Sequence, residues 1–186
     1  MRSLRVILAF VTLAAVGGCS VPAPYAVAAD PALDAPYRLA SGDRVRVIVF
    51  GQDGLSNSFS VDGAGAIAMP LIGDLRAQGL TTSELARSIE ARLKQGYVRE
   101  PHASVEVEAF RPFFVMGEVN VAGQYPFING MTVQNAIAVA GGFTPRAVMD
   151  SVNITRTVGG SLATFAEPLA FPVRPGDTIT VRERIF

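Results

Sequence analysis

The chain has 186 residues, of which 49% are hydrophobic, so it can bury the core of one domain or of two small ones. Basic and acidic residues number 16 each, and this balance excludes the strongly basic surface with which proteins bind nucleic acid. One cysteine and one histidine exclude an internal disulfide and a structural zinc or iron–sulfur centre, and we expect no cofactor.

The N-terminus has the pattern of a secretory signal. Arg2 and Arg5 precede an apolar run over residues 6–16, in which only Thr12 is polar. A helix over this run would span about 16 Å, roughly half of a bilayer's hydrocarbon core, which disfavours a permanent membrane anchor. We therefore expect residues 1–18 to be removed as a signal peptide.

The signal ends in Val-Gly-Gly-Cys, which resembles a bacterial lipobox, whose cysteine is acylated and begins the mature chain. Cys19 could otherwise be a small buried side chain. However, residues 20–36 are rich in proline and alanine without a helical or strand period, as in a tether. We expect a lipid anchor on Cys19 and a tether over residues 19–36. Ser20 in the next position is typical of sorting to the outer membrane.

The first strand is predicted over residues 38–50. It opens with a turn that contains Gly42 and Asp43, the first suited to positive φ and the second to a local side-chain hydrogen bond. Valines then alternate with other residues from position 45 to position 49, which is typical of a strand with one buried face.

A hairpin is predicted around Asp62 and Gly63, because Asp-Gly favours a tight turn and residues 66–72 can form the strand that follows. The segment from Met69 through Pro70, Leu71 and Ile72 to Gly73 is either a core strand or a surface between subunits. A proline restricts a strand to the edge of a sheet, where strands pair with neighbours.

A helix is predicted over residues 82–95. Thr81 is placed as its N-cap, and Glu84 three residues later completes a capping box. Apolar residues recur every fourth position from Leu85, so one face of the helix should pack on a sheet.

The next strand contains Glu106 and Glu108 between valines. Two carboxylates at this spacing lie about 7 Å apart, within the range of inverting glycosidases. We favour a solvated strand face on which Arg44 and Arg46 pair with the glutamates from a neighbouring strand. His102 has no partner motif for catalysis, and we interpret it as a surface residue.

A second unit begins near residue 112. Strands are predicted over residues 113–116 up to Gly117, near Gly123, and over residues 152–156, 163–165 and 178–181; Thr132 caps a short helix that Gly141 and Gly142 end. The Gly-Asp turn at residues 42–43 recurs at residues 176–177, which we interpret as convergent turn chemistry. We predict an α+β fold of two small β-rich modules, the first with β-α-β order.

In this order the motifs resemble the bacterial outer-membrane polysaccharide export family over residues 37–186. The first unit resembles that family's polysaccharide export domain at residues 37–43, 61–63, 69–73 and 79–81. The second resembles an SLBB (soluble-ligand-binding β-grasp) module at residues 115–119, 123–125 and 132–145. The resemblance implies an export domain over residues 37–111 and an SLBB domain over residues 112–186.

Two departures from the family affect the prediction. The usual Gly-Pro-Gly-Asp-like turn is Ala-Ser-Gly-Asp at residues 40–43, which keeps Gly-Asp but loses the rigid proline. The resemblance implies that family members which form a pore by themselves are longer chains, with several β-grasp modules and a C-terminal helix that crosses the outer membrane. This sequence ends after a strand, so we expect the acyl chains to be its only membrane insertion.

The resemblance implies a non-enzymatic lipoprotein of the outer membrane that faces the periplasm. Its expected partners are the exported capsular or exopolysaccharide, further copies of itself in a homo-oligomeric ring, and an inner-membrane polysaccharide copolymerase. One alternative is a lipid-anchored carbohydrate-binding adaptor that forms no conduit. A more remote alternative is a periplasmic glycan hydrolase that uses Glu106 and Glu108.

Aromatic side chains are the usual contact surface for sugars, and six of them could serve either there or in the core: Tyr97, Phe110, Phe113, Phe114, Tyr125 and Phe127. The sequence does not separate these two roles.

Overall fold

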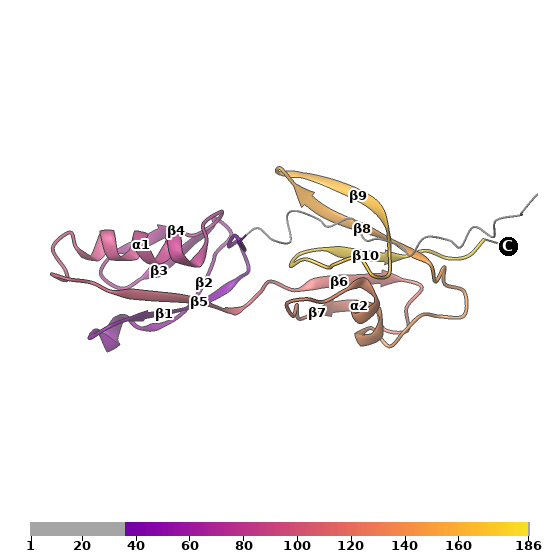
Figure 1. Ribbon diagram of the computed structural model, residues 1–186, viewed down its shortest axis with the longest axis horizontal. Coiled ribbons are helices and arrows are strands. Elements are labelled where there is room, and N and C mark those ends of the chain that lie inside the picture. The colour runs from indigo at the N-terminus through magenta and orange to yellow at the C-terminus, as the bar shows by residue number, and fades with distance from the viewer. Residues whose placement is uncertain (1–35, 186) are drawn as a thin grey trace, which may run out of the picture.

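Two separate hydrophobic cores divide residues 36–185, which are the residues that the computed structural model describes. One core draws its buried side chains from Leu39 to Val105, and the other from Phe113 to Val181. Figure 1 shows the two modules end to end along the long axis, joined by the segment between β5 and β6. The predicted α+β fold of two small modules is confirmed.

The first module contains a three-stranded antiparallel sheet in the order β2-β1-β5. Its strands are β1 (Arg44–Val49), β2 (Asn57–Ser60) and β5 (Ala103–Ala109), and a short 3-10 turn, η1 (Asp53–Leu55), connects β1 to β2. The alternation in β1 has the predicted effect, because Val45, Val47 and Val49 are buried and the residues between them are exposed.

The prediction of a hairpin around Asp62 is wrong, because the strands before and after this turn do not pair with each other. Strand β2 pairs with β1, whereas β3 (Ala66–Met69) pairs with β4 (Gly73–Arg76) in a separate two-stranded sheet. Oδ1 of Asp62 accepts hydrogen bonds from the N–H groups of Ala64 and Ala66, at 2.9 and 2.8 Å. The turn therefore carries the chain between two sheets, and Gly65 rather than Gly63 takes the positive φ.

The strand predicted over residues 66–72 ends earlier, at Met69. The chain turns back through Pro70, Leu71 and Ile72 before β4 begins, so Pro70 lies in a hairpin turn rather than in an edge strand. Leu71 takes a φ of 68°, a conformation that is rare for any residue other than glycine, so residue preferences do not predict a turn at this position.

Helix α1 (Thr82–Leu93) lies across the first module, two residues shorter at its end than predicted. Leu85, Ile89 and Leu93 are fully buried in the first core, as the four-residue spacing predicts. Lys94 is the C-cap, and Gly96 then turns the chain with a φ of 102°.

The second module is a five-stranded sheet in the order β7-β6-β10-β8-β9, packed on the short helix α2. Strand β6 (Phe113–Gly117) pairs in parallel with β10 (Thr178–Val181), and all other pairs, including the one to β7 (Gly123–Tyr125), are antiparallel. Helix α2 (Val133–Val139) begins after Thr132, whose side chain forms a capping box with Asn135.

The last hairpin is longer than the sequence predicts. Strands β8 (Ser151–Val158) and β9 (Ser161–Pro168) pair along their whole length, whereas β10 pairs with only three residues of β8. Gly159 and Gly160 both take positive φ at the tip, as two-residue hairpin turns require. The tip extends beyond the core, so its residues lack the alternating pattern on which the prediction depended.

The predicted signal peptide, Cys19 and the tether lie outside the described residues, apart from Pro36. Within residues 36–185, no helix has the length and apolar character needed to cross a membrane.

Candidate functional site

The carboxylate of Asp43 holds together the joint between the two modules. Its side chain is completely buried, and Oδ2 accepts hydrogen bonds from the backbone N–H of Ala40 at 2.8 Å and the hydroxyl of Tyr37 at 2.6 Å. Oδ1 accepts a hydrogen bond of 2.9 Å from the backbone N–H of Arg111. The same oxygen lies 3.6 Å from Nη1 of the Arg111 guanidinium. The predicted local hydrogen bond is present, together with long-range contacts that the turn chemistry did not predict.

Tyr37 is a neutral donor in this network. Burial, and next the hydrogen bond to the Asp43 carboxylate, raise the pKa of Tyr37 well above its usual range, although the nearby Arg111 opposes this shift. The phenol therefore stays protonated and donates to Asp43, while Nη1 of Arg111 donates to the phenol oxygen at 2.8 Å. Three side chains are thus linked in one hydrogen-bonded cluster.

Arg111 lies between the two Gly-Asp turns of the chain. A Cβ on Gly42 would lie 3.3 Å from Cβ of Arg111, and a Cβ on Gly176 would lie 2.7 Å from its Nε. Both glycines take positive φ, 93° and 85°. The positive φ therefore favours glycine at both turns, and a Cβ on Gly176 would also require the Arg111 side chain to shift.

The second turn repeats the bonding of the first. Asp177 is buried and accepts the backbone N–H of Arg174 at 2.7 Å, as Asp43 accepts that of Ala40. Nε and Nη2 of Arg156 donate to its two carboxylate oxygens at 2.8 and 2.7 Å, a bidentate pair that is 9% exposed on the arginine side. The shared Gly-Asp chemistry therefore produces the same turn at the two positions that flank Arg111.

Aromatic rings continue the joint into the second module. Phe110 makes edge contacts with Tyr37 and Phe127, with ring centroids 4.8 and 5.4 Å apart. Of the other aromatic candidates, Phe113 is fully buried, and Tyr125 packs against it. Tyr97 and Phe114 are exposed, which leaves these two for contact with a ligand.

The buried polar side chains of the joint are all satisfied by hydrogen bonds within the protein. Across residues 36–185, every buried side-chain nitrogen or oxygen has a hydrogen-bond partner. We therefore interpret Tyr37, Asp43, Phe110 and Arg111 as residues that fix the modules relative to each other.

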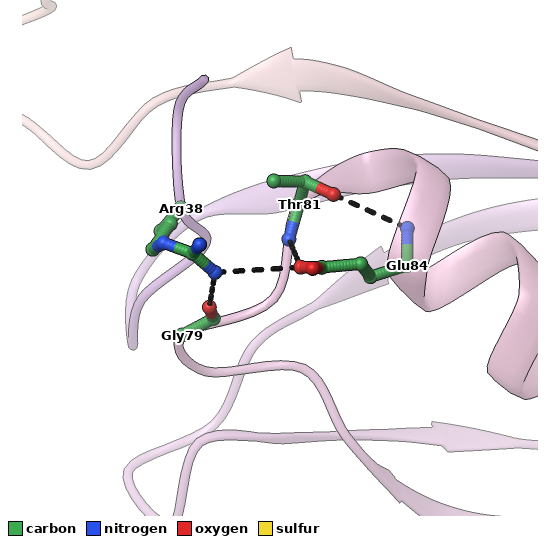
Figure 2. Close-up of polar contacts among 4 residues, drawn as sticks. All are labelled: Arg38, Gly79, Thr81 and Glu84. Carbon is green, nitrogen blue, oxygen red and sulfur yellow. Dashed lines mark hydrogen bonds and ion pairs between the residues drawn. The ribbon is translucent and has the colours of Figure 1, made fainter. Parts of the chain in front are cut away.

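Arg38 ties the entry of the chain to the start of α1 (Figure 2). Its Nη1 donates to the carbonyl of Gly79 at 2.7 Å and to Oε2 of Glu84 at 3.4 Å. The same carboxylate oxygen accepts the N–H of Thr81 at 2.8 Å, and Oγ1 of Thr81 accepts the N–H of Glu84 at 3.2 Å. The predicted capping box is therefore confirmed.

The capping box also makes Glu84 a stronger acid. The backbone hydrogen bond from Thr81, opposed by partial desolvation and aided by Arg38 and Arg87, lowers the pKa of Glu84 below its usual value. A lowered pKa in the folded state means that the ionised cap stabilises the helix above the usual glutamate pKa. This stabilisation is lost as the pH falls through the folded pKa.

Replacing Thr81 with alanine should lower the stability of the first module by about 1 kcal/mol, because an N-cap hydrogen bond is lost. At neutral pH this corresponds to a fall in Tm of about 4 to 8 °C for a domain of this size. Thr82→Ala is the matched control, because Thr82 follows the cap and is not part of the box. Equal melting curves for wild type and Thr81→Ala would contradict this role of the cap.

The hairpin tip at Pro70, Leu71 and Ile72 is a second candidate site. Met69 and Ile72 are buried, whereas the side chain of Leu71 is 60% exposed and its backbone is in the left-handed region. A branched side chain held in this conformation costs energy, and strained residues cluster where proteins bind. Of the two predicted roles for this segment, the structure places Met69 and Ile72 in the core and Leu71 on the surface.

The predicted family-motif glycines have structural placements. Gly117 takes a φ of 87° where β6 approaches β10, and a Cβ there would collide with the carbonyl of Val181. Gly141 and Gly142 take positive φ after α2, and Asn120 donates to the carbonyl of Gly141 at 2.6 Å. Gly73 begins β4 with a φ of 68°, and Gly123 begins β7 with open space around it.

Glu106 and Glu108 are exposed on β5, beside β1. Nε of Arg44 lies 3.1 Å from Oε2 of Glu108, and Arg46 is opposite Glu106 in the sheet register. This is the cross-strand arrangement that we favour from the sequence. His102 is exposed just before β5. Across the described residues, no group of three or more potential metal-ligating side chains is placed to hold a metal ion.

Sequence reasoning did not identify Arg111, Arg156 and Asp177 as partners in buried networks. Asp177 carried a signal, since it repeats the Gly-Asp pattern of residue 43 in front of an alternating strand. The arginines carried none, because Arg111 is separated from Asp43 by 68 positions and Arg156 from Asp177 by 21.

Two family models match successive parts of the chain. The family model described as polysaccharide biosynthesis/export protein matches residues 31–108, and the model of the SLBB domain matches residues 112–166. The exopolysaccharide production protein ExoF of Rhizobium meliloti is 35% identical over 118 residues, which cover 57% of this chain and 28% of ExoF. A polysialic acid transport protein, KpsD of Escherichia coli, is 25% identical over 111 residues, which cover 59% of this chain and 20% of KpsD. The matched region is thus less than a third of either relative.

Proposed function

We propose that this chain, a member of the polysaccharide export protein family, takes part in the export of capsular or exopolysaccharide. The observation that carries the proposal is the succession of an export-domain match and an SLBB-domain match in one chain, over two separate hydrophobic cores. The names of the relatives, exopolysaccharide production and polysialic acid transport, support the same role.

The proposed location is the periplasmic side of the outer membrane, with acyl chains on Cys19 as the anchor. The lipobox-like sequence and the proline-rich segment after it support this location. Arg38 then holds the first described residues against the start of α1. This contact would fix the point at which a tether leaves the module.

We propose that copies of the chain assemble into a ring that acts with an inner-membrane polysaccharide copolymerase. A long hydrated polymer needs a passage lined by polar groups that hold it weakly, and a ring of small β-rich modules provides one without chemistry. The exposed Leu71 at a strained turn is the proposed contact with the neighbouring copy. In the alternative, a carbohydrate-binding adaptor, the same anchor carries a monomer.

The proposed role involves no catalysis by Glu106 and Glu108. The ion pair between Arg44 and Glu108 and the exposure of both glutamates favour a solvated strand face over the carboxylate pair of a hydrolase. Substituting both glutamates with glutamine should therefore leave polysaccharide export unchanged.

Changing Cys19 to serine should release the protein from the membrane or leave its signal uncleaved, because the thiol that carries the lipid is lost. Membrane fractionation and mass spectrometry of the N-terminal peptide measure this outcome. The control is Ser20→Ala, which keeps the thiol. A wild-type protein without lipid on residue 19 that stays in the soluble fraction would contradict the proposed anchor.

The export role itself is tested by deleting the gene and measuring polysaccharide at the cell surface. We expect surface polysaccharide to be lost and the wild-type chain to restore it. Unchanged surface polysaccharide in the deletion strain would contradict the role.

A further inference from the structure

The sheet of the second module has one face that does not belong to its core. Alternation along the strands places Phe113, Val115 and Ile179 in the core with α2, where they are buried. The residues between them, beginning with Phe114 and Met116, point to the opposite side, which we call the open face. Their side chains are 41% and 48% exposed.

The sheet register aligns hydroxyl groups in a row across the open face. Thr178 on β10 lies between Phe114 on β6 and Thr155 on β8, and Thr164 follows on β9. The hydroxyls of Thr155 and Thr164 are 2.9 Å apart, within hydrogen-bond distance. One row therefore presents an aromatic ring followed by three hydroxyls.

A second row runs parallel to the first. Thr180 lies between Met116 and Asn153, and Ala166 is opposite Asn153 on β9. On the other side of Phe114, Gln124 of β7 extends the first row. Hydroxyl and amide groups both donate and accept hydrogen bonds, so the two rows offer both functions over a flat area.

The open face carries no charged side chain at any strand position that the register assigns to it. At its rim, Nη2 of Arg182 donates to Oγ of Ser151 at 2.8 Å. An acidic ligand would therefore lose hydration on this face without meeting a cation on the strands. A ligand of neutral polar groups would lose little.

We propose that the open face binds a neutral stretch of glycan, with a sugar ring stacked on Phe114 and sugar hydroxyls bonded to the threonine and asparagine rows. This inference rests on the proposed function and names the surface and the class of sugar. The strand positions of this face are uncharged and rich in hydroxyl groups, with Arg182 at the rim, and they complement an uncharged polyol. A second copy of the chain is a poorer fit, since a dry interface would bury these hydroxyl groups beside few large apolar side chains.

Phe114 differs in this respect from the other exposed aromatic side chains. Tyr97 is followed closely by Arg99 and Glu100, and Phe50 lies at the end of β1 in the other module. Neither is part of an uncharged sheet face. Phe165 on β9 is 38% exposed, but it is opposite the buried Ile154 in the register and so lies on the other side of the sheet from Phe114. Phe50, which is 65% exposed, is therefore a matched control for substitution of Phe114.

The test is native affinity electrophoresis of the full chain in detergent, with dextran as the neutral probe and polygalacturonate as the acidic probe. We expect dextran to retard the wild type and the Phe50→Ala variant equally. Phe114→Ala should weaken the retardation by about tenfold, since a desolvated aromatic contact is lost. The double variant Thr155→Val and Thr164→Val should weaken it also, with Thr82→Val as its control away from the face.

Several results would overturn the inference: no retardation by dextran, equal retardation of Phe114→Ala and wild type, or stronger retardation by polygalacturonate. A Phe114→Ala variant that changes the oligomer mass in light scattering but not the retardation would assign the face to self-association instead. Circular dichroism confirms that each variant is folded. If the chain restores surface polysaccharide in the deletion strain while Phe114→Ala binds dextran normally, this inference fails and the export role stands. If it restores none, the export role fails.

Discussion

Replacing Asp43 with alanine should destabilise the first module by about 3 kcal/mol, the cost of removing one partner from a buried charged network. The carboxylate is completely buried and accepts hydrogen bonds from Tyr37, Ala40 and Arg111. All three donors would lose their acceptor at once, and the Arg111 guanidinium would lose its nearest charge. Urea unfolding followed by circular dichroism measures the change.

Asp62→Ala is the matched control for this prediction. Asp62 also accepts two backbone hydrogen bonds in a turn, but it is exposed and has no charged partner in the network. We expect its loss to cost about 1 kcal/mol or less. If Asp43→Ala unfolds at the same urea concentration as Asp62→Ala, then the Asp43 network does not stabilise the module as inferred.

Replacing Leu71 with aspartate should abolish assembly of the proposed ring while the monomer stays folded. Leu71 is 60% exposed, so its loss removes little from the core. Aspartate also adopts the left-handed conformation more readily than leucine does, so the turn with φ 68° should not be disturbed. A charge in a buried contact between copies would oppose association strongly. Light scattering measures the oligomer mass, and the melting curve measures the monomer.

Ser83→Asp is the control for the Leu71 variant, because it adds the same charge in an exposed first turn of α1. We expect this control to assemble as the wild type does. If Leu71→Asp assembles equally well, the hairpin tip is not the contact between copies.

Local patterns predicted those elements whose causes are local. The sequence predicted both the capping box at Thr81 and Glu84 and the buried face of β1. Each of these features depends on residues within one helical turn or one strand. The turn at Asp62 was also predicted, from its Asp-Gly sequence. The pairing of the strands on either side of this turn was not predicted. Packing of the first core, and not the turn, determines that β3 pairs with β4.

The joint between the modules was beyond local reasoning. Tyr37 and Arg111 form a hydrogen bond although they are separated by 74 positions, so no local pattern predicts their contact. The strained turn at Leu71 was missed for a different reason, since leucine with positive φ contradicts the residue preferences on which turn prediction depends. Local signals therefore predicted the modules better than the contacts that orient them.

Electron microscopy of a soluble version that begins at residue 20, behind a cleavable signal without a lipobox, tests the proposed ring most directly. The sample is imaged at high concentration, with and without an inner-membrane polysaccharide copolymerase from the same organism, and its mass is measured by light scattering. We expect closed rings in at least one of these conditions. A protein that stays monomeric at every concentration, with and without the copolymerase, would contradict the conduit and support the carbohydrate-binding adaptor.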